Sequence, residues 1–169
     1  MATQNLKLSL LCQQPTLINR LTKTHSDIQS IIEGVDLEQQ VYEDTDWRIR
    51  DILGHIATWD REVTKSLQAY RRGTEYFIPG ISEDETDFNK QAVSEQRKLS
   101  TQQIVSEWEQ ARKDFKASII DIKADQFPGD LLYTWGDERG SVIQLVEFMI
   151  EHDEEHLDEI KKALRQSQN

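Results

Sequence analysis

The chain has 169 residues, which is typical of a single domain and long enough for a core that needs no disulfide or structural metal. Its seven glycines and three prolines are about half of their usual combined share, which favours long helices over the many turns of an all-β fold. The formal net charge of −11 supplies no basic face, so nucleic acid and anionic membrane surfaces are not expected partners.

The lone Cys12 excludes an internal disulfide, a cysteine-rich zinc site and a Cys-x-x-Cys redox pair. Hydrophobic residues make up 37% of the chain, so its acidity does not indicate disorder. No apolar run reaches the length of a signal peptide or of a membrane span. We therefore expect a folded, soluble and cytoplasmic protein.

Apolar residues at helical spacing predict a first helix that begins near Pro15, where a first turn tolerates proline, and ends at Gly34. The residues before Pro15 are weakly patterned and are interpreted as a loose or short helical lead-in. A second helix is predicted from an N-cap at Asp46 to Gly73. The following segment, 74–83, contains proline, glycine and serine and is predicted to be a loop across one end of the domain.

A third helix is predicted to start near Asp84 and to break at Ser100. There, Ser100 and Gln103 have the form of a capping box, which indicates that the helix restarts. It continues to about Ile122 and is followed by a loop over residues 127–140, rich in glycine and aromatic residues.

Ser141 and Gln144 have the form of another capping box, and a last helix is predicted from there to about Leu164. Long amphipathic helices joined in this order predict an all-α fold, a four-helix bundle. We expect one domain over residues 1–169, with its core at about 15–165. Bundles build cofactor sites from side chains on facing helices, so site residues are expected on those faces.

The histidines are the strongest candidates for such a site. His152 and His156 lie four residues apart, which places both imidazoles on one face of the last helix. His55 lies at the edge of the apolar stripe of the second helix, and edge positions on two facing helices can converge near one mouth of a bundle. Three neutral imidazoles would leave open positions on a divalent metal for water or substrate. Zinc, nickel and iron all accept imidazole, so the metal stays open.

Other interpretations of the histidines compete with this one. The pair could be solvated on an acidic helix, and His25 falls on the apolar stripe of the first helix, where a core role is more common than a ligand role. The run from His152 to His156 is similar to the His-Glu-x-x-His motif of zinc peptidases, but Asp153 replaces the glutamate and no later histidine follows. No histidine has a glutamate three residues before it, which argues against a ferritin-like di-iron centre.

Carboxylates crowd residues 147–159 of the last helix, a stretch that contains no lysine or arginine. Most of them are interpreted as a solvated face, and a few as acceptors that orient the ligand imidazoles. The residues are Glu147, Glu151, Asp153, Glu154, Glu155, Asp158 and Glu159.

The segment 46–60 resembles the signature of the DinB/YfiT-like superfamily. In that signature a tryptophan opens the second helix, an aspartate follows four residues later and a histidine four after that, often with an aromatic residue and an acid next. Those places are filled here by Trp47, Asp51, His55, Trp59 and Asp60. The family's last helix carries a His-x-x-x-His pair, which His152 and His156 match. Residues 87–89 and 100–108 resemble the subset related to the ClbS/DfsB proteins and the DinB-like 2 group.

The resemblance implies a bundle of up-down-down-up topology, a divalent metal held by three histidines near one end, and a homodimer. Relatives of this family include S-transferases and isomerases that use bacillithiol, mycothiol or glutathione, and a cyclopropane hydrolase that protects against a genotoxin. Many relatives have glutamine three residues after the final histidine, where this chain has Glu159.

The resulting hypothesis is a metal-dependent enzyme that acts on a small molecule, by hydrolysis or by thiol-dependent transfer. His55, His152 and His156 would hold the divalent ion, and Asp60 and Asp153 are the candidates for a general base or for orienting the ligands. A low-molecular-weight thiol is the possible second cofactor. The alternative is a non-catalytic bundle that binds a metal or a ligand.

Two further groups of side chains belong to this hypothesis. Aromatic residues are expected to line a pocket for an apolar or electrophilic molecule, with ordinary packing as the competing interpretation; they are Trp59, Tyr76, Phe77 and Trp135. A thiolate co-substrate is anionic and needs a basic anchor, and the cluster available near the expected site is Arg61, Arg71 and Arg72.

Overall fold

The structure is a computed structural model that describes the backbone of residues 2–81 and 85–166, and side chains from residue 13 onward. Within these residues the chain forms helices and one small hairpin. The elements are α1 (Ala2–Ile32), α2 (Ile49–Arg71), α3 (Glu85–Gln96), α4 (Thr101–Ile120), the 3-10 turn η1 (Ala124–Gln126), β1 (Leu131–Leu132), β2 (Arg139–Gly140) and α5 (Val142–Gln166).

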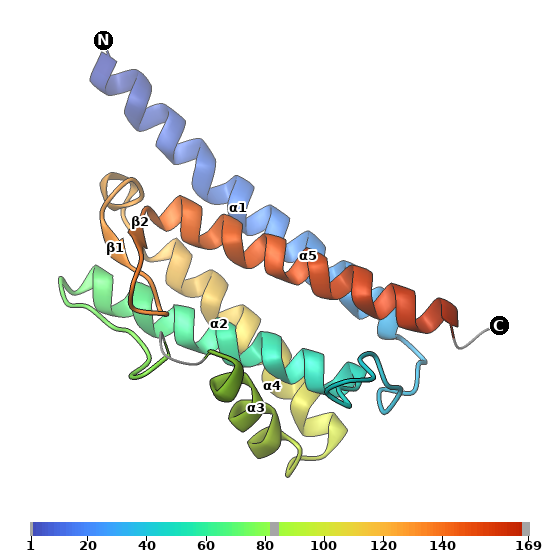
Figure 1. Cartoon of the computed structure of the whole chain (residues 1–169). Coiled ribbons are helices and arrows are strands. Elements are labelled where there is room, and N and C mark those ends of the chain that lie inside the picture. The colour runs from blue at the N-terminus through green and yellow to red at the C-terminus, as the bar shows by residue number, and fades with distance from the viewer. Residues whose placement is uncertain (1, 82–84, 167–169) are drawn as a thin grey trace.

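The four long helices form a bundle of two parallel pairs (Figure 1). Helices α1 and α5 pack together and run in one direction, while α2 and α4 pack together and run in the other. The order along the chain is therefore up-down-down-up, and the all-α fold is confirmed. The short α3 lies outside the bundle against α2, so the break before Ser100 separates two helices rather than kinking one.

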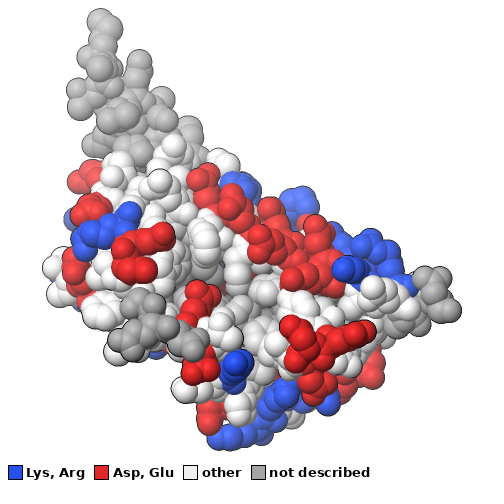
Figure 2. All heavy atoms as spheres, viewed as in Figure 1, with Lys and Arg blue, Asp and Glu red and all other residues white. Residues whose placement is uncertain are grey.

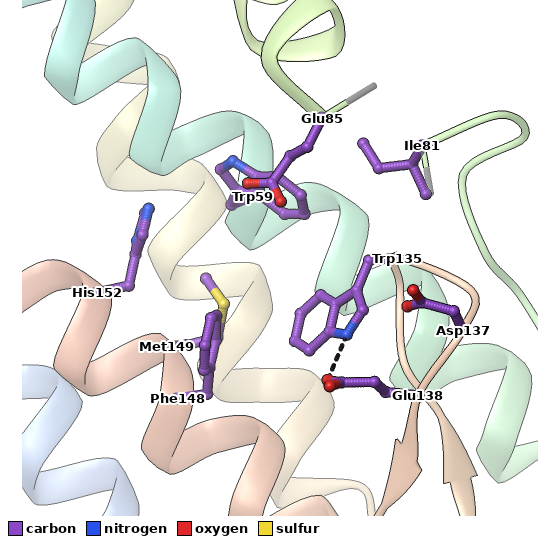
Figure 3. A pocket seen from close by; sticks show the side chains of 9 residues that line it. All are labelled: Trp59, Ile81, Glu85, Trp135, Asp137, Glu138, Phe148, Met149 and His152. Carbon is purple, nitrogen blue, oxygen red and sulfur yellow. Dashed lines mark hydrogen bonds between the residues drawn. The ribbon is translucent and has the colours of Figure 1, made fainter. Parts of the chain in front are cut away.

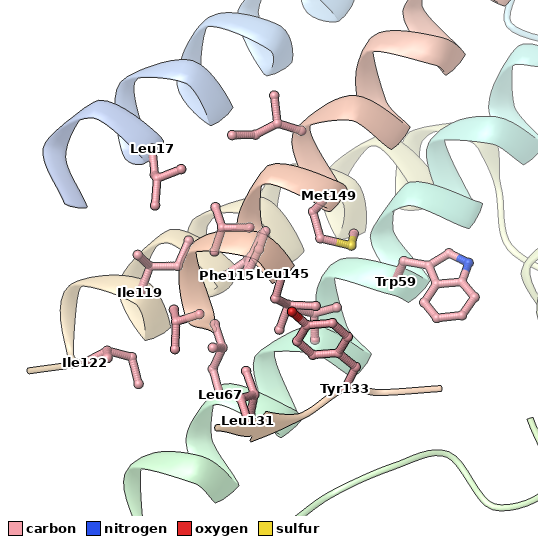
Figure 4. Close-up of a cluster of buried hydrophobic side chains, with 14 of the residues drawn as sticks. Leu17, Trp59, Leu67, Phe115, Ile119, Ile122, Leu131, Tyr133, Leu145 and Met149 are labelled. Carbon is pink, nitrogen blue, oxygen red and sulfur yellow. The ribbon is translucent and has the colours of Figure 1, made fainter. Parts of the chain in front are cut away.

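The core consists of two hydrophobic clusters that follow each other along the bundle axis. One surrounds Phe115 and Leu145 near the hairpin (Figure 4), and the other surrounds Ile56 and Trp108 near the loop before α2. Amphipathic stripes on α2, α4 and α5 supply both clusters, as period-3.6 patterning requires. Between the two clusters, the stripes are interrupted by charged residues, which are described with the site below.

Two predicted helix starts are wrong. Helix α1 begins at Ala2 and contains Pro15, so the lead-in is continuous helix rather than a loose segment. Helix α2 begins at Ile49 with Arg48 as its N-cap, and Asp46 instead occupies a turn with φ of 54°. The carboxylate of Asp51 accepts the backbone N–H of Arg48 at 3.0 Å, which closes the first turn from inside the helix.

Both predicted capping boxes are present. The Ser100 hydroxyl accepts the backbone N–H of Gln103, whose side chain accepts the N–H of Ser100. Ser141 and Gln144 make the same exchange at the start of α5. The predicted loop 127–140 contains the hairpin of β1 and β2, which was not predicted because each strand has two residues.

We expect Ser100→Ala to lower the free energy of unfolding by about 1 kcal/mol, because the first turn of α4 loses its side-chain acceptor. Urea unfolding followed by circular dichroism measures the change. Ser26→Ala, at an exposed position of α1, is the control and should change the free energy by less than about 0.5 kcal/mol. Equal stability of Ser100→Ala and wild type would contradict the role of this cap.

Candidate metal centre

His55, His152 and His156 lie together between α2 and α5. Each offers one nitrogen, and these three atoms lie within 4.8 Å of one another. His55 comes from the second turn of α2, and the two others come from consecutive turns of α5. The sequence brings them together because each lies at the edge of an apolar stripe, so packing the stripes turns the three imidazoles toward one another.

The distances between the ring nitrogens fit ligands of one metal ion. Nε2 of His152 lies 3.1 Å from Nε2 of His55 and 3.2 Å from Nε2 of His156. With metal–nitrogen bonds of about 2.1 Å, neighbouring ligands lie about 3.0 Å apart in octahedral geometry and about 3.4 Å apart in tetrahedral geometry. Hydrogen bonds alone do not satisfy the arrangement, since one imidazole nitrogen carries one hydrogen or one lone pair and Nε2 of His152 has two such neighbours.

The far side of His156 is held by two polar side chains. Its Nδ1 lies 2.7 Å from Glu159 Oε2, and the Tyr42 hydroxyl donates to the same carboxylate oxygen. Burial opposes ionisation of Glu159, but the hydrogen bonds from His156 and Tyr42 outweigh it and lower the pKa of Glu159. An ionised Glu159 accepts the Nδ1 hydrogen, so Nε2 of His156 presents its lone pair to the other two histidines.

His55 is the most buried of the three, with 5% of its surface exposed. Burial lowers the pKa of His55 well below its ordinary value, and the neighbouring His156 and His152 lower it further. The ring of Trp47 packs beside it with centroids 5.1 Å apart. His55 is therefore neutral at pH 7, the form in which imidazole binds metals.

A buried ion-pair triad lies between the two hydrophobic clusters. Arg112 of α4 donates from Nε to Asp60 of α2 at 2.8 Å, and its Nη2 lies 2.5 Å from Asp153 of α5. All three side chains are at most 1% exposed. Asp153 also places Oδ1 3.7 Å from Nδ1 of His152. The triad thus joins three helices directly beneath the histidine cluster.

The pKa values of the two acids of the triad are shifted in opposite directions. Burial raises the pKa of Asp60, with Asp153 adding to the effect and Arg112 opposing it. Burial also opposes ionisation of Asp153, but the charge of Arg112 outweighs it and lowers the pKa of Asp153. Asp60 and Asp153 both pair with the guanidinium of Arg112 inside the bundle, and of the two acids Asp153 is the one that lies beside a histidine of the cluster. Their roles as general base or as orienting residues stay predictions.

A cavity of about 370 Å³ opens next to His152 (Figure 3). This volume lies within the range of about 300–1,000 Å³ found for small-molecule sites. Helices α2, α3 and α5 and the hairpin turn all contribute to it. Its walls are formed by Trp59, Ile81, Glu85, Trp135, Asp137, Glu138, Phe148, Met149 and His152.

Two of the four aromatic residues expected in a pocket line this cavity. Trp59 and Trp135 do so, with ring centroids 6.5 Å apart. Tyr76 instead donates its hydroxyl to Glu62 on α2. Phe77 is 49% exposed and lies against Gly136, outside the wall of this cavity.

The basic cluster expected near the site is not there. Arg61 pairs with Glu107 of α4 at 3.1 Å, on the side of α2 that faces α4. Arg71 and Arg72 lie at the other end of α2, about 24 Å along the helix from His55. The prediction of a nearby basic anchor for an anionic thiol is therefore wrong. Arg61 lies on another face of α2 than His55, and Arg71 and Arg72 lie at the other end of that helix.

His25 lies outside the histidine cluster. Its ring packs on Trp108 with centroids 4.0 Å apart. Burial, together with the charges of Arg112 and Lys116, lowers the pKa of His25 to about 4. His25 is thus a neutral, half-buried residue that packs against the core, as the interpretation of a packed histidine predicts.

Most carboxylates of the last helix face solvent, along the ridge of α5 in Figure 2. Glu151, Glu154 and Glu155 are exposed. Asp153 is buried and pairs with Arg112, and the half-buried Glu159 contacts His156. The interpretation of a mainly solvated face thus agrees with the structure, and the orienting role of the other carboxylates stays a prediction.

Sequence reasoning missed Arg112, Tyr42 and Phe148. Arg112 carried a usable signal, since it falls on the apolar stripe of α4 between Trp108 and Phe115, where a surface arginine does not belong. Tyr42 lies in the loop between α1 and α2, where no periodicity indicates which side chains turn inward. Phe148 is 51% exposed and forms a wall only because the hairpin turn lies opposite it.

Comparisons with known proteins give one match to a family and one match to a fold. A sequence model of the DinB superfamily matches residues 6–160. The structure is similar to that of an uncharacterised protein from Escherichia coli UTI89, with a TM-score of 0.74 and 15% sequence identity over 92% of this chain and 94% of that chain. At this identity the similarity concerns the fold alone. No protein of curated function matches the chain.

Proposed function

The chain belongs to the DinB superfamily, and from its histidine cluster we propose that it is a divalent-metal-dependent enzyme that acts on a small molecule, by hydrolysis in preference to thiol transfer. The observation that carries this proposal is the convergence of three imidazole nitrogens beside a cavity of about 370 Å³. Three protein ligands with an adjacent space for substrate are typical of catalytic metal sites, whereas structural sites use four protein ligands.

In the proposed reaction, the metal ion and the protein side chains have different roles. A bound divalent ion supplies Lewis acidity, which makes water or a thiol nucleophilic near neutral pH and polarises a carbonyl group. Glu159 holds the His156 ring with its Nε2 toward the cluster, and Tyr42 holds Glu159. Asp153, fixed by Arg112, lies beside His152. The aromatic wall beside His152 binds the body of the substrate and excludes water from it.

The preference for hydrolysis rests on charge. Thiol co-substrates such as glutathione and bacillithiol carry carboxylates and need basic partners. The described wall of the cavity contains Glu85, Asp137 and Glu138 but no lysine or arginine. Thiol transfer is the second candidate function, since the open side of the histidine cluster suits a thiolate as well as water.

A substrate screen tests the proposal and separates the two reactions. Zinc-, nickel- and iron-loaded protein would be assayed on small esters, lactones, amides and epoxides, with and without glutathione, bacillithiol or mycothiol. We expect turnover without thiol that disappears after chelation and in His55→Ala, while His25→Ala retains it. Turnover only with a thiol would favour the transferase. Stoichiometric metal with no turnover on any class would favour the non-catalytic alternative.

We expect Glu159→Ala to weaken zinc binding about tenfold or more, because the Nδ1 hydrogen of His156 loses its acceptor and the ring loses its orientation. Competition titration with a chromogenic chelator measures the dissociation constant. Glu155→Ala removes an exposed carboxylate of the same helix and serves as the control. The role of Glu159 is contradicted if both variants bind zinc equally well.

Among the described residues, none of the helices contains a hydrophobic stretch that could span a lipid bilayer. The homodimer implied by the family resemblance stays a prediction, which sedimentation equilibrium tests directly.

A further inference from the structure

The wall of the cavity combines aromatic rings with acidic side chains. The rings are those of Trp59, Trp135 and Phe148, and three carboxylates lie among them. Glu85, Asp137 and Glu138 are exposed at the rim, and none of them forms an ion pair with a described residue. Arg139, the nearest cation in the chain to Glu138, is instead engaged by Asp130 and Glu75. Among the described residues that line the cavity, three are thus acidic and none is a lysine or an arginine.

The aromatic rings of the cavity wall differ in burial: Trp59 belongs to the hydrophobic core with 6% of its surface exposed, Trp135 packs partly against that core, and Phe148 is exposed. Trp135 lies 5.0 Å from Phe148 and 6.5 Å from Trp59, centroid to centroid, at interplanar angles of 48° and 67°. Phe148 keeps 51% of its surface exposed, although it is one of the largest apolar side chains of α5. Tilted rings around a small space offer several π faces to one guest, and such faces attract ammonium groups as well as hydrocarbon.

The hairpin turn fixes one of the carboxylates in this arrangement. The indole N–H of Trp135 donates to Glu138 Oε2 at 2.8 Å, so the ring and the carboxylate hold each other in place. Figure 3 shows Asp137 and Glu138 on one side of the cavity and His152 on the opposite side. The anionic side is thus separated from the histidine cluster by the aromatic wall.

We propose that the cavity takes a cationic amphiphile, a small molecule with an apolar or aromatic body and an ammonium group. The body lies against Trp59, Trp135 and Phe148, and the ammonium group faces Asp137 and Glu138. The opposite end then reaches His152, where a hydrolysable group would react. This inference rests on the proposed function, because it takes the cavity beside His152 as the substrate site.

Three probes with one phenylbutyl body test the charge preference: 4-phenylbutylammonium, 4-phenylbutanol and 4-phenylbutanoate. Titration calorimetry and tryptophan fluorescence would measure their dissociation constants at low salt. We expect the ammonium probe to bind about tenfold more tightly than the carboxylate, with the alcohol between them. We also expect added salt to narrow the difference, since the rim carboxylates are exposed to solvent.

Two triple variants, each of which removes three carboxylates, test which residues cause the preference for the ammonium probe. Glu85→Gln/Asp137→Asn/Glu138→Gln removes the three carboxylates of the wall, and the glutamine oxygen at position 138 still accepts the Trp135 indole hydrogen. In this variant the three probes should bind within about twofold of one another. The control, Glu154→Gln/Glu155→Gln/Asp158→Asn, removes the same charge from the outer face of α5 and should bind the probes as wild type does.

Several results would overturn the inference: no saturable binding of the ammonium probe, equal or tighter binding of the carboxylate, or the same loss of preference in both triple variants. Repeating the titrations on chelated protein and on His152→Ala/His156→Ala separates this inference from the proposed function. A charge preference that survives without metal supports the cavity even if the metal proposal fails. If the protein binds stoichiometric metal but the probes show no charge preference, the inference of a cationic ligand is refuted and the proposed metal site is not.

Discussion

We expect Arg112→Leu to lower the free energy of unfolding by about 3–5 kcal/mol. The substitution removes the cation shared by Asp60 and Asp153 and leaves two carboxylates at most 1% exposed without a partner. Because a whole domain is stable by about 5–15 kcal/mol, the variant would lose a large part of its stability. Urea unfolding followed by tryptophan fluorescence measures the difference.

Two further variants control this prediction. Arg61→Leu removes an arginine from the same α2–α4 interface, but its pair with Glu107 is about 40% exposed and should contribute less than about 1 kcal/mol. The triple variant Asp60→Leu/Arg112→Leu/Asp153→Leu replaces the triad with hydrocarbon and should recover most of the lost stability. If Arg112→Leu is as stable as Arg61→Leu, the triad does not hold the three helices as described.

The second large effect concerns the histidines themselves. We expect zinc at one hundred times its dissociation constant to stabilise the wild-type protein by about 2.7 kcal/mol, and the same zinc concentration to leave His152→Ala/His156→Ala unchanged. The double variant keeps His55 as the single remaining ligand of the cluster. Thermal unfolding with added zinc or with a chelator measures both values.

His25→Ala is the matched control for the double variant, because His25 packs on Trp108 outside the cluster. It should retain the full stabilisation by zinc, although its own unfolding temperature falls with the lost packing. Equal stabilisation of the wild-type protein and of His152→Ala/His156→Ala would show that zinc binds elsewhere.

The bundle was predictable because its signals are periodic. Stripes of apolar residues predicted the long helices, and the capping boxes at Ser100 and Ser141 predicted where two of them begin. The start at Asp46 was wrong because the actual cap comes from inside the helix, where Asp51 accepts the N–H of Arg48. Local hydrogen-bonding preferences do not distinguish these two solutions, and tertiary packing decides between them.

The histidine cluster was predictable in position but not in its surroundings. The spacing of His152 and His156 and the stripe edge at His55 indicated a shared site, and the structure brings the three rings together. Their role as metal ligands stays a prediction. The support from Tyr42 depends on how an irregular loop folds over α5, and the wall at Trp135 depends on a hairpin of two-residue strands. Neither contact leaves a periodic pattern in the sequence.

In the proposed function, three imidazoles of this chain hold one divalent ion. Anomalous diffraction at the zinc absorption edge, on crystals of zinc-loaded protein, tests it most directly. We expect one strong anomalous peak per chain, about 2.1 Å from Nε2 of His55, His152 and His156. A zinc-loaded crystal whose anomalous peaks all lie away from these three nitrogens would contradict it.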